Sequence, residues 1–298
     1  MIPHDMSVAL DTLASSFEGQ RPRLVALGYR LLGSRAEADE IVQEAWLRLQ
    51  GSVERGELLD SVPAWLTRVT TRLALDLQRS APRRRETYIG PWLPEPIASE
   101  AWQASSPEAE RIRAESLSLT CMTLLETLSP LERAAWLLVD VFEEEPSVVA
   151  EILGREPAAI RQLCHRARAH LESGRGRFTA TREAHERLLM AMAKATSTGD
   201  LAGLAALLTS DVVVLSDSGG RQSAATRPLH GIERASRFLM GVARKAPFDS
   251  IQAVLVNGAP ALLWRRGKAR GVLALACDGD RIAAVYLLGN PDKLHSFQ

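Results

Sequence analysis

The chain has 298 residues, and 46% of them are apolar, which suffices for the cores of about two globular domains and excludes a mostly disordered chain. Its 36 lysines and arginines balance its 36 aspartates and glutamates, so any attraction to nucleic acid or to a membrane must be local. No apolar run approaches the roughly 18 residues of a membrane span and the first residues do not form a signal peptide, so we expect a cytoplasmic protein.

The first predicted unit, residues 1–86, begins with a pair of helices. A leucine stripe at Leu24, Leu27, Leu31 and Leu32 ends at Gly33, which predicts a helix and its stop. Ser34 and Glu37 then form a capping-box pattern, and apolar residues recur at helical spacing from position 38 to position 49. The two segments therefore predict an antiparallel helical hairpin.

The second of these helices has an acidic outer face. Seven acidic residues and two arginines lie between positions 36 and 60. Such a face repels DNA, and we interpret it either as a solvated surface or as a docking surface for a basic protein partner. Its outward side chains are Asp39, Glu40, Gln43 and Glu44.

A third helix is predicted from Ser61, as its cap, with Pro63 in the first turn and an apolar face that includes Trp65 and Leu66. Its far end is basic, with Arg79, Arg83, Arg84 and Arg85 against a single glutamate at position 86. These arginines form either a solubilising tail or a set of phosphate contacts. The proline-containing stretch that follows has no helical stripe and predicts a linker over residues 87–107.

The second predicted unit, residues 108–178, contains a helix-turn-helix. A helix opens at Ser129-Pro130, a second follows Pro146 and stops at Gly154, and a longer one opens at Pro157. From position 155 to position 177 six arginines face two glutamates, which suits DNA. At the start of the last helix, the small residues Ala158 and Ala159 allow close approach to base edges. Arg161 and Gln162 follow and suit hydrogen bonds to bases. Further along, His165, Arg166 and Arg168 suit contacts with phosphates.

The three cysteines predict neither a disulfide framework nor a zinc site, because they are far apart and no second ligand stands at metal-binding spacing. Cys164 lies on the apolar stripe of the last helix, so we expect a core thiol there and not a ligand beside His165. Buried thiols are also the expectation for Cys121 and Cys277. We therefore expect no metal and no cofactor.

Together, the two helical units resemble the extracytoplasmic-function (ECF) sigma factors of bacteria over about residues 7–175. The segment AEADEIVQEAWLRL (36–49) is similar to the region 2 helix that docks on the coiled coil of RNA polymerase, and PAWLTRVTTRLALDLQRS (63–80) to the helix over the −10 promoter element. LSPLERAAWLLVDVF (128–142) and VVAEILGREPAAIRQLCHRARAHL (148–171) are similar to region 4, which ends in the −35 recognition helix. A departure is Glu156-Pro157, where a serine cap is common in the family.

The resemblance implies a binding protein and not an enzyme: a factor that brings RNA polymerase core to promoter DNA and starts transcription. It assigns polymerase contacts to Asp39, Glu40, Gln43 and Glu44, and −35 contacts to the seven outward residues of the last helix. It assigns −10 contacts to Arg72, Asp76, Arg79, Arg83, Arg84 and Arg85. A loop within residues 51–62 is expected to hold an extruded −10 base.

The third predicted unit, residues 183–298, has an α+β composition. We expect helices over 183–195, 201–208 and 232–245, and strands over 211–216, 251–257, 261–266, 271–277 and 282–288, with hairpin turns at Asn257-Gly258 and Asp278-Gly279. This order resembles the SnoaL-like branch of the NTF2 and ketosteroid-isomerase fold, a cone. Its candidate proton carriers are Asp217, His230, Asp249 and Tyr286, for which a surface or hydrogen-bonded role is favoured over catalysis.

Short motifs are similar to those of the SigJ-type subgroup of these sigma factors, which carries such an extension and implies that no separate anti-sigma factor is required. They are Trp92-Leu93-Pro94-Glu95-Pro96 in the linker, Asn290-Pro291-Asp292-Lys293-Leu294 near the end, and Asp217-Ser218-Gly219-Gly220-Arg221, which resembles a glycine-rich DGGGK element. A proline-stiffened linker that docks Trp92 on the cone would fix the separation of the two DNA-binding units. The cone is therefore expected to regulate the factor.

Two other functions stay open. A one-component repressor would use the cone as a ligand sensor and bind duplex DNA without polymerase, although this leaves the segment from 36 to 80 unexplained. An isomerase or cyclase would need an acid and a base that converge inside the cone. The sequence does not indicate whether the cone binds a small ligand.

Overall fold

The computed structural model describes residues 4–86, 88–99, 118–174, 180–245 and 248–297, with the side chains of 4–12, 80–86 and 173–174 left aside. The chain divides into two compact units: residues 1–83 with 128–168, and residues 84–127 with 169–298. The domain boundaries expected from the sequence stay predictions. No helix in the described ranges is long and apolar enough to cross a membrane.

The first compact unit contains the predicted helical hairpin. Helix α1 (His4–Leu32) ends at Gly33, whose φ of 72° lies in the left-handed region that glycine tolerates, and α2 (Arg35–Glu54) starts where Ser34 Oγ accepts a hydrogen bond from Glu37 N. The leucine stripe of α1 and the stripe of α2 are buried against each other. Helix α3 (Val62–Glu86) starts at its cap Ser61, whose Oγ accepts from Ala64 N at 3.4 Å. The loop before it is shorter than expected, because α2 continues through residues 51–54.

The helix-turn-helix is formed by α7 (Pro146–Leu153) and α8 (Pro157–Gly174), separated by Gly154 with φ +61°. Ahead of it, α6 (Pro130–Trp136) begins with a reciprocal capping box between Ser129 and Glu132. The chain then continues as a short π-helix, η2 (Leu137–Val141), which the helical spacing did not predict.

The second compact unit is built around one six-stranded sheet in the order β2-β1-β6-β5-β4-β3. Its strands are β1 (Leu208–Asp217), β2 (Leu229–His230), β3 (Ser250–Val256), β4 (Ala259–Arg266), β5 (Ala269–Asp278) and β6 (Arg281–Leu288). Hairpins join β3 to β6 as predicted, and Asn257 and Gly258 both have positive φ, as a two-residue hairpin turn requires. The short β2 and the parallel pairing of β1 with β6 were not predicted.

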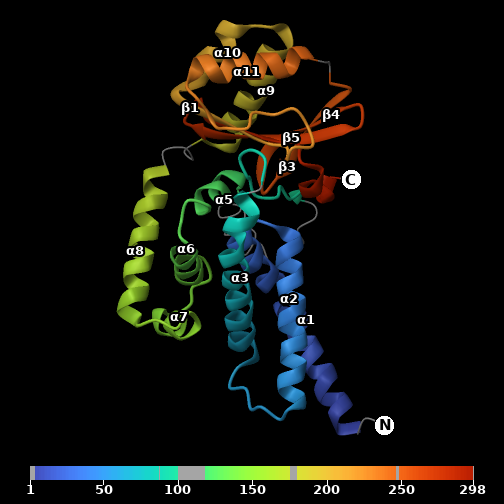
Figure 1. Ribbon diagram of the computed structural model, residues 1–298, viewed down its shortest axis with the longest axis vertical. Coiled ribbons are helices and arrows are strands. Elements are labelled where there is room, and N and C mark those ends of the chain that lie inside the picture. Colours follow the sequence, from blue (N-terminus) through green and yellow to red (C-terminus); the bar gives the residue numbers. More distant parts are fainter. Residues whose placement is uncertain (1–3, 87, 100–117, 175–179, 246–247, 298) are drawn as a thin grey trace. The chain divides into compact units, whose positions relative to one another are not determined.

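The two faces of this sheet are covered differently. Helices α9 (Arg182–Thr198), α10 (Leu201–Leu207) and α11 (Ile232–Lys245) pack on one face, in a core that includes Met192, Leu239 and Val285 (Figure 1). The linker, the start of α5 (Leu119–Leu125) and the C-terminal 3-10 turns η4 (Pro291–Lys293) and η5 (His295–Phe297) cover the other face. That second core includes Leu93, Leu119, Tyr286, Leu294 and Phe297. The expected α+β cone after two all-α units is confirmed, with the linker added as part of its core.

Candidate functional site

The acidic face predicted for α2 is present on one side of that helix. Glu40 and Gln43 are exposed, while Asp39 and Glu44 are about half exposed and form i,i+4 ion pairs with Arg35 and Arg48, both at 2.8 Å. Exposed pairs of this kind contribute little to stability. The four side chains therefore remain available to a partner that carries positive charge.

The residues proposed to face the −10 element lie along α3. Arg72 and Asp76 are exposed, and Asp76 pairs with Arg79 at 3.2 Å. The side chains of Arg83, Arg84 and Arg85 lie outside the described residues, so that part of the hypothesis stays a prediction. Ahead of α3, the loop side chain of Leu58 is 99% exposed, which is unusual for a leucine and places an apolar side chain where an extruded base was expected.

Helix α8 separates apolar from polar side chains as predicted. Ile160, Leu163, Cys164 and Ala167 are buried, so the Cys164 thiol is a core group, and burial raises its pKa. Ala159 is half-buried, and the other outward residues are exposed: Ala158, Arg161, Gln162, His165, Arg166 and Arg168. These residues lie together on the outer face of the second helix of a helix-turn-helix, which is the element that enters the major groove in such motifs.

Two of the α8 arginines are already held by carboxylates of the same unit. Arg166 Nε donates to Glu132 Oε1 at 2.7 Å, and Arg168 donates to Asp140 Oδ1 at 2.8 Å. The hydrogen bond from Arg166, followed by those from Ser129, lowers the pKa of Glu132. Arg161 has no ion-pair partner among the described residues, so its guanidinium is free to approach a base.

Contacts between α1, α3 and the α6–α7 segment were not foreseen from the sequence. Arg23 Nη2 lies 2.6 Å from Glu144 Oε1, and Arg133 Nε donates to the Arg30 carbonyl oxygen at 2.7 Å. Arg72, assigned to −10 DNA, donates from Nε to the Ile152 carbonyl oxygen at 3.2 Å. The residues in these pairs are 80 to 121 positions apart, and nothing in local spacing indicates such partners.

In the second compact unit, Tyr88 of the linker meets residues of the 217–221 and 290–294 motifs in one cluster, here called the linker latch: Tyr88, Asp217, Asn290 and Lys293. The carboxylate of Asp217 is completely buried and accepts hydrogen bonds from Leu93 N at 2.8 Å, from Lys293 Nζ at 2.8 Å and from the Tyr88 hydroxyl. Asn290 Nδ2 donates to the Tyr88 hydroxyl oxygen at 2.9 Å. Burial, and then the bond to Asp217, raise the pKa of Tyr88.

Lys293 joins the linker to the end of the chain. Its Nζ donates to the Leu93 carbonyl oxygen at 2.5 Å and lies 4.0 Å from the centre of the Trp92 ring, a cation–π geometry. Further along the linker, Ile97 N donates to Asn257 Oδ1 at 2.9 Å and Ser296 Oγ donates to the Pro96 carbonyl oxygen at 3.1 Å. Leu93, Pro94, Glu95 and Pro96 are all buried.

The glycine-rich element fits the latch closely. Gly219 and Gly220 have φ values of 56° and 74°. A Cβ atom built on Gly219 would lie 2.6 Å from Asn290 Nδ2, and one on Gly220 would lie 2.8 Å from Ile89 Cδ1. Glycine is therefore required at position 219 both by conformation and by contact.

The candidate proton carriers do not converge. His230 and Asp249 are exposed, Tyr286 is buried in the core beneath the linker, and only Asp217 lines the cavity of the cone. Asp249 Oδ2 accepts a hydrogen bond from Gly267 N, which is a turn contact. In the described ranges, no group of three or more His, Cys, Asp or Glu side chains is placed to hold a metal ion.

Comparison with known proteins gives matches over both helical units. The Sigma-70 region 2 family matches residues 17–84 and the Sigma-70 region 4 family matches residues 120–171. The chain is 37% identical to the ECF RNA polymerase sigma factor SigJ of Mycobacterium tuberculosis, over 94% of this chain and 92% of that protein. It is 30% identical to the probable ECF RNA polymerase sigma factor SigI of the same species, over 95% of this chain and 95% of that protein. The crystal structure of M. tuberculosis SigJ matches with a TM-score of 0.75 at 34% identity, over 95% of this chain and 98% of that one.

Proposed function

The chain belongs to the ECF RNA polymerase sigma factors, which direct core polymerase to promoters, and we propose which of its surfaces serve that function. The acidic face of α2, formed by Asp39, Glu40, Gln43 and Glu44, docks on the core enzyme. The outward face of α8 binds the −35 element, and α3, with the arginines that follow it, binds the −10 element. The observation that carries this proposal is the opposite charge of two exposed helical faces within one compact unit.

Transcription in vitro with purified core polymerase tests the docking surface. Glu40→Arg reverses an exposed charge on α2, and we expect loss of run-off transcripts from a promoter that the unaltered factor uses. Glu186→Arg, an exposed change on α9 of the cone, is the matched control and leaves transcription intact. Undiminished transcription with Glu40→Arg overturns the proposed docking face.

The cone regulates the factor through the linker. The linker connects α3 to the helices of region 4, and the latch holds it on the sheet at Asp217 and Lys293. While the latch is closed, it restricts the separation that the two DNA-binding regions adopt, and the last residues of the chain set the strength of this restraint. The restraint takes the place of a separate anti-sigma factor.

Opening the latch is the test of this regulation. Lys293→Met, and separately removal of residues 290–298, is expected to raise transcription several-fold at limiting factor concentration. Arg221→Gln, which disrupts only an exposed 3.5 Å pair with Asp292, is expected to leave transcription unchanged. Unchanged output from both latch variants contradicts the proposal.

A repressor that binds duplex DNA alone makes a different prediction. It would retain a promoter fragment in a gel-shift experiment without core polymerase, whereas the sigma-factor proposal requires the core enzyme. We assign no bond-making chemistry to this chain, and we place it in the cytoplasm, where polymerase and chromosome are found.

A further inference from the structure

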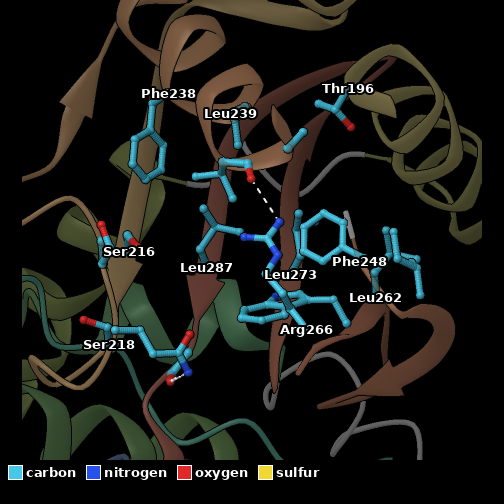
Figure 2. A pocket seen from close by; sticks show the side chains of 18 of the residues that line it. Thr196, Ser216, Ser218, Phe238, Leu239, Phe248, Leu262, Arg266, Leu273 and Leu287 are labelled. Atoms are coloured by element: carbon cyan, nitrogen blue, oxygen red, sulfur yellow. Dashed lines mark hydrogen bonds between the residues drawn. The ribbon is translucent and has the colours of Figure 1, made fainter. Parts of the chain in front are cut away.

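The cone contains a cavity that neither polymerase docking nor DNA binding uses. It lies between α9, α11 and the helix-covered face of the sheet, and its volume is about 130 Å³. Its walls are mainly apolar and include Phe238, Phe248, Leu262, Leu273 and Leu287 (Figure 2). The Trp264 side chain also lines it. A cavity of roughly 150 Å³ with such walls accepts a benzene ring, so this one accommodates a single small ring or a branched chain.

Arg266 supplies one positive charge to this apolar space. Its guanidinium stacks over the Phe248 ring, 4.2 Å from the ring centre, and its Nη2 donates to the Val242 carbonyl oxygen at 3.0 Å (Figure 2). Its Nε is fully enclosed and has no hydrogen-bond partner. A buried donor without an acceptor costs free energy, so the described protein groups do not satisfy all the hydrogen-bond donors of this arginine.

No carboxylate of the described chain neutralises this arginine. Asp217, the carboxylate that lines the cavity, is bonded to Lys293, Tyr88 and Leu93 N. Asp249, which immediately precedes β3, accepts from Gly267 N. Arginine pairs most strongly with carboxylates, because its planar fork matches both carboxylate oxygens.

We propose that the cavity of the cone binds a small carboxylic acid with a compact apolar body, held by Arg266. The carboxylate accepts from the Arg266 guanidinium, and the apolar body packs on Leu262, Leu273 and the aromatic rings. The hydroxyl groups of Ser216 and Ser218 line the same cavity from the end of β1 (Figure 2). Asp217 lies between these two serines, so the ligand site and the linker latch share a wall, although binding itself does not depend on the sigma-factor function.

Three probes of the same shape test the proposal on the full-length chain: benzoate, benzamide and benzylamine. Calorimetric titration is expected to show that benzoate binds at least about tenfold more tightly than the neutral and the cationic probe, the effect of a charge-assisted pair. Equal binding of the three probes, or no binding of any, overturns the proposal.

Variants then locate the charge that gives this preference. Arg266→Gln is expected to reduce the ratio of benzoate to benzamide affinity to about one, and Arg266→Lys to keep part of it. Arg265→Gln is the matched control, because this exposed neighbour points to the opposite face of β4 and the ratio stays unchanged. Ala243→Phe fills the cavity and is expected to abolish binding of all three probes.

Persistence of the benzoate preference in Arg266→Gln, or its loss in Arg265→Gln, contradicts the assignment to Arg266. Circular dichroism melting curves establish that each variant is folded. If Arg266→Gln does not fold, the probe series on the unaltered chain and the Arg266→Lys variant still decide the question.

Discussion

Lys293 and Asp217 form an ion pair of 2.8 Å in which the aspartate side chain is completely buried and the lysine side chain is 12% exposed. The pair joins the end of the chain to the end of β1, and both residues also bond to the backbone of Leu93. Burial makes this pair sensitive to the loss of either partner, because the remaining charge stays in an environment with little water.

Lys293→Met is therefore expected to destabilise the second compact unit by about 3–5 kcal/mol, the usual cost of leaving one charge of a buried pair alone. The measurement is urea unfolding of the full-length chain followed by tryptophan fluorescence. Arg221→Gln removes a cation from an exposed pair in the same region and should change the free energy of unfolding by less than about 0.5 kcal/mol. Equal losses in the two variants would mean that the latch is not a buried pair in solution.

Gly219→Ala tests the contact of the glycine-rich element with Asn290. Gly219 and Gly279 have the same φ of 56°, but a Cβ at Gly219 meets Asn290 Nδ2 at 2.6 Å while one at Gly279 meets nothing within 4 Å. Gly279→Ala should cost about 1 kcal/mol, the penalty of the left-handed backbone alone. Gly219→Ala should cost at least about 1 kcal/mol more by the same urea measurement, and an equal cost would show that Asn290 moves aside freely.

Helices were predictable wherever their signals are local. Ser61 and Ser129 start helices as caps, Gly33 and Gly154 end them, and residues 232–245 form a helix with the expected bounds. The same holds for the polar face of α8, because the side-chain period of a helix depends on its own residues alone. Capping residues and helical periodicity therefore suffice to predict these helices and the polar face of α8.

Contacts between distant residues were not predictable in this way. Asp217 was expected at the surface or in a hydrogen bond, and its complete burial depends on Tyr88 and Lys293, which are 129 and 76 positions away. The parallel pairing of β1 with β6 likewise joins strands separated by the whole α11–β5 segment. The motifs at 92–96 and 290–294 indicated that the linker and the chain end matter, but not that Asp217 connects them.

The interactions of Glu132 at the start of α6 should make the free energy of unfolding of the first compact unit depend on pH. Its folded-state pKa is lowered, mainly by Arg166, so its contribution is present above the unfolded pKa of about 4.3 and is lost as the pH falls through the lower folded value. Glu132→Gln should therefore destabilise the first unit by about 1–2 kcal/mol at pH 7 and by progressively less below pH ~4. Glu151→Gln, from an exposed pair with Arg68, should change stability by less than about 0.5 kcal/mol at pH 7. A Glu132→Gln loss that does not shrink in acid would assign the effect to packing instead.

The arginines of α8 should differ in how they affect promoter binding. Arg161 is exposed near the start of the helix, whereas Arg166, five residues further along, is held by Glu132. Arg161→Ala should cost about 1–3 kcal/mol at the preferred −35 sequence and less at altered sequences, because a base contact is lost.

Arg166→Ala should instead weaken binding about equally at every −35 sequence and lower the salt dependence by about one ion, as loss of a phosphate contact does. Fluorescence anisotropy of holoenzyme on a set of −35 variants at several salt concentrations distinguishes the two behaviours. Arg187→Ala, an exposed change in the cone, controls for total charge. If Arg161→Ala were equally harmful at all −35 sequences, Arg161 would contact the backbone of the DNA, and readout of bases would have to come from Gln162 and the two alanines before it.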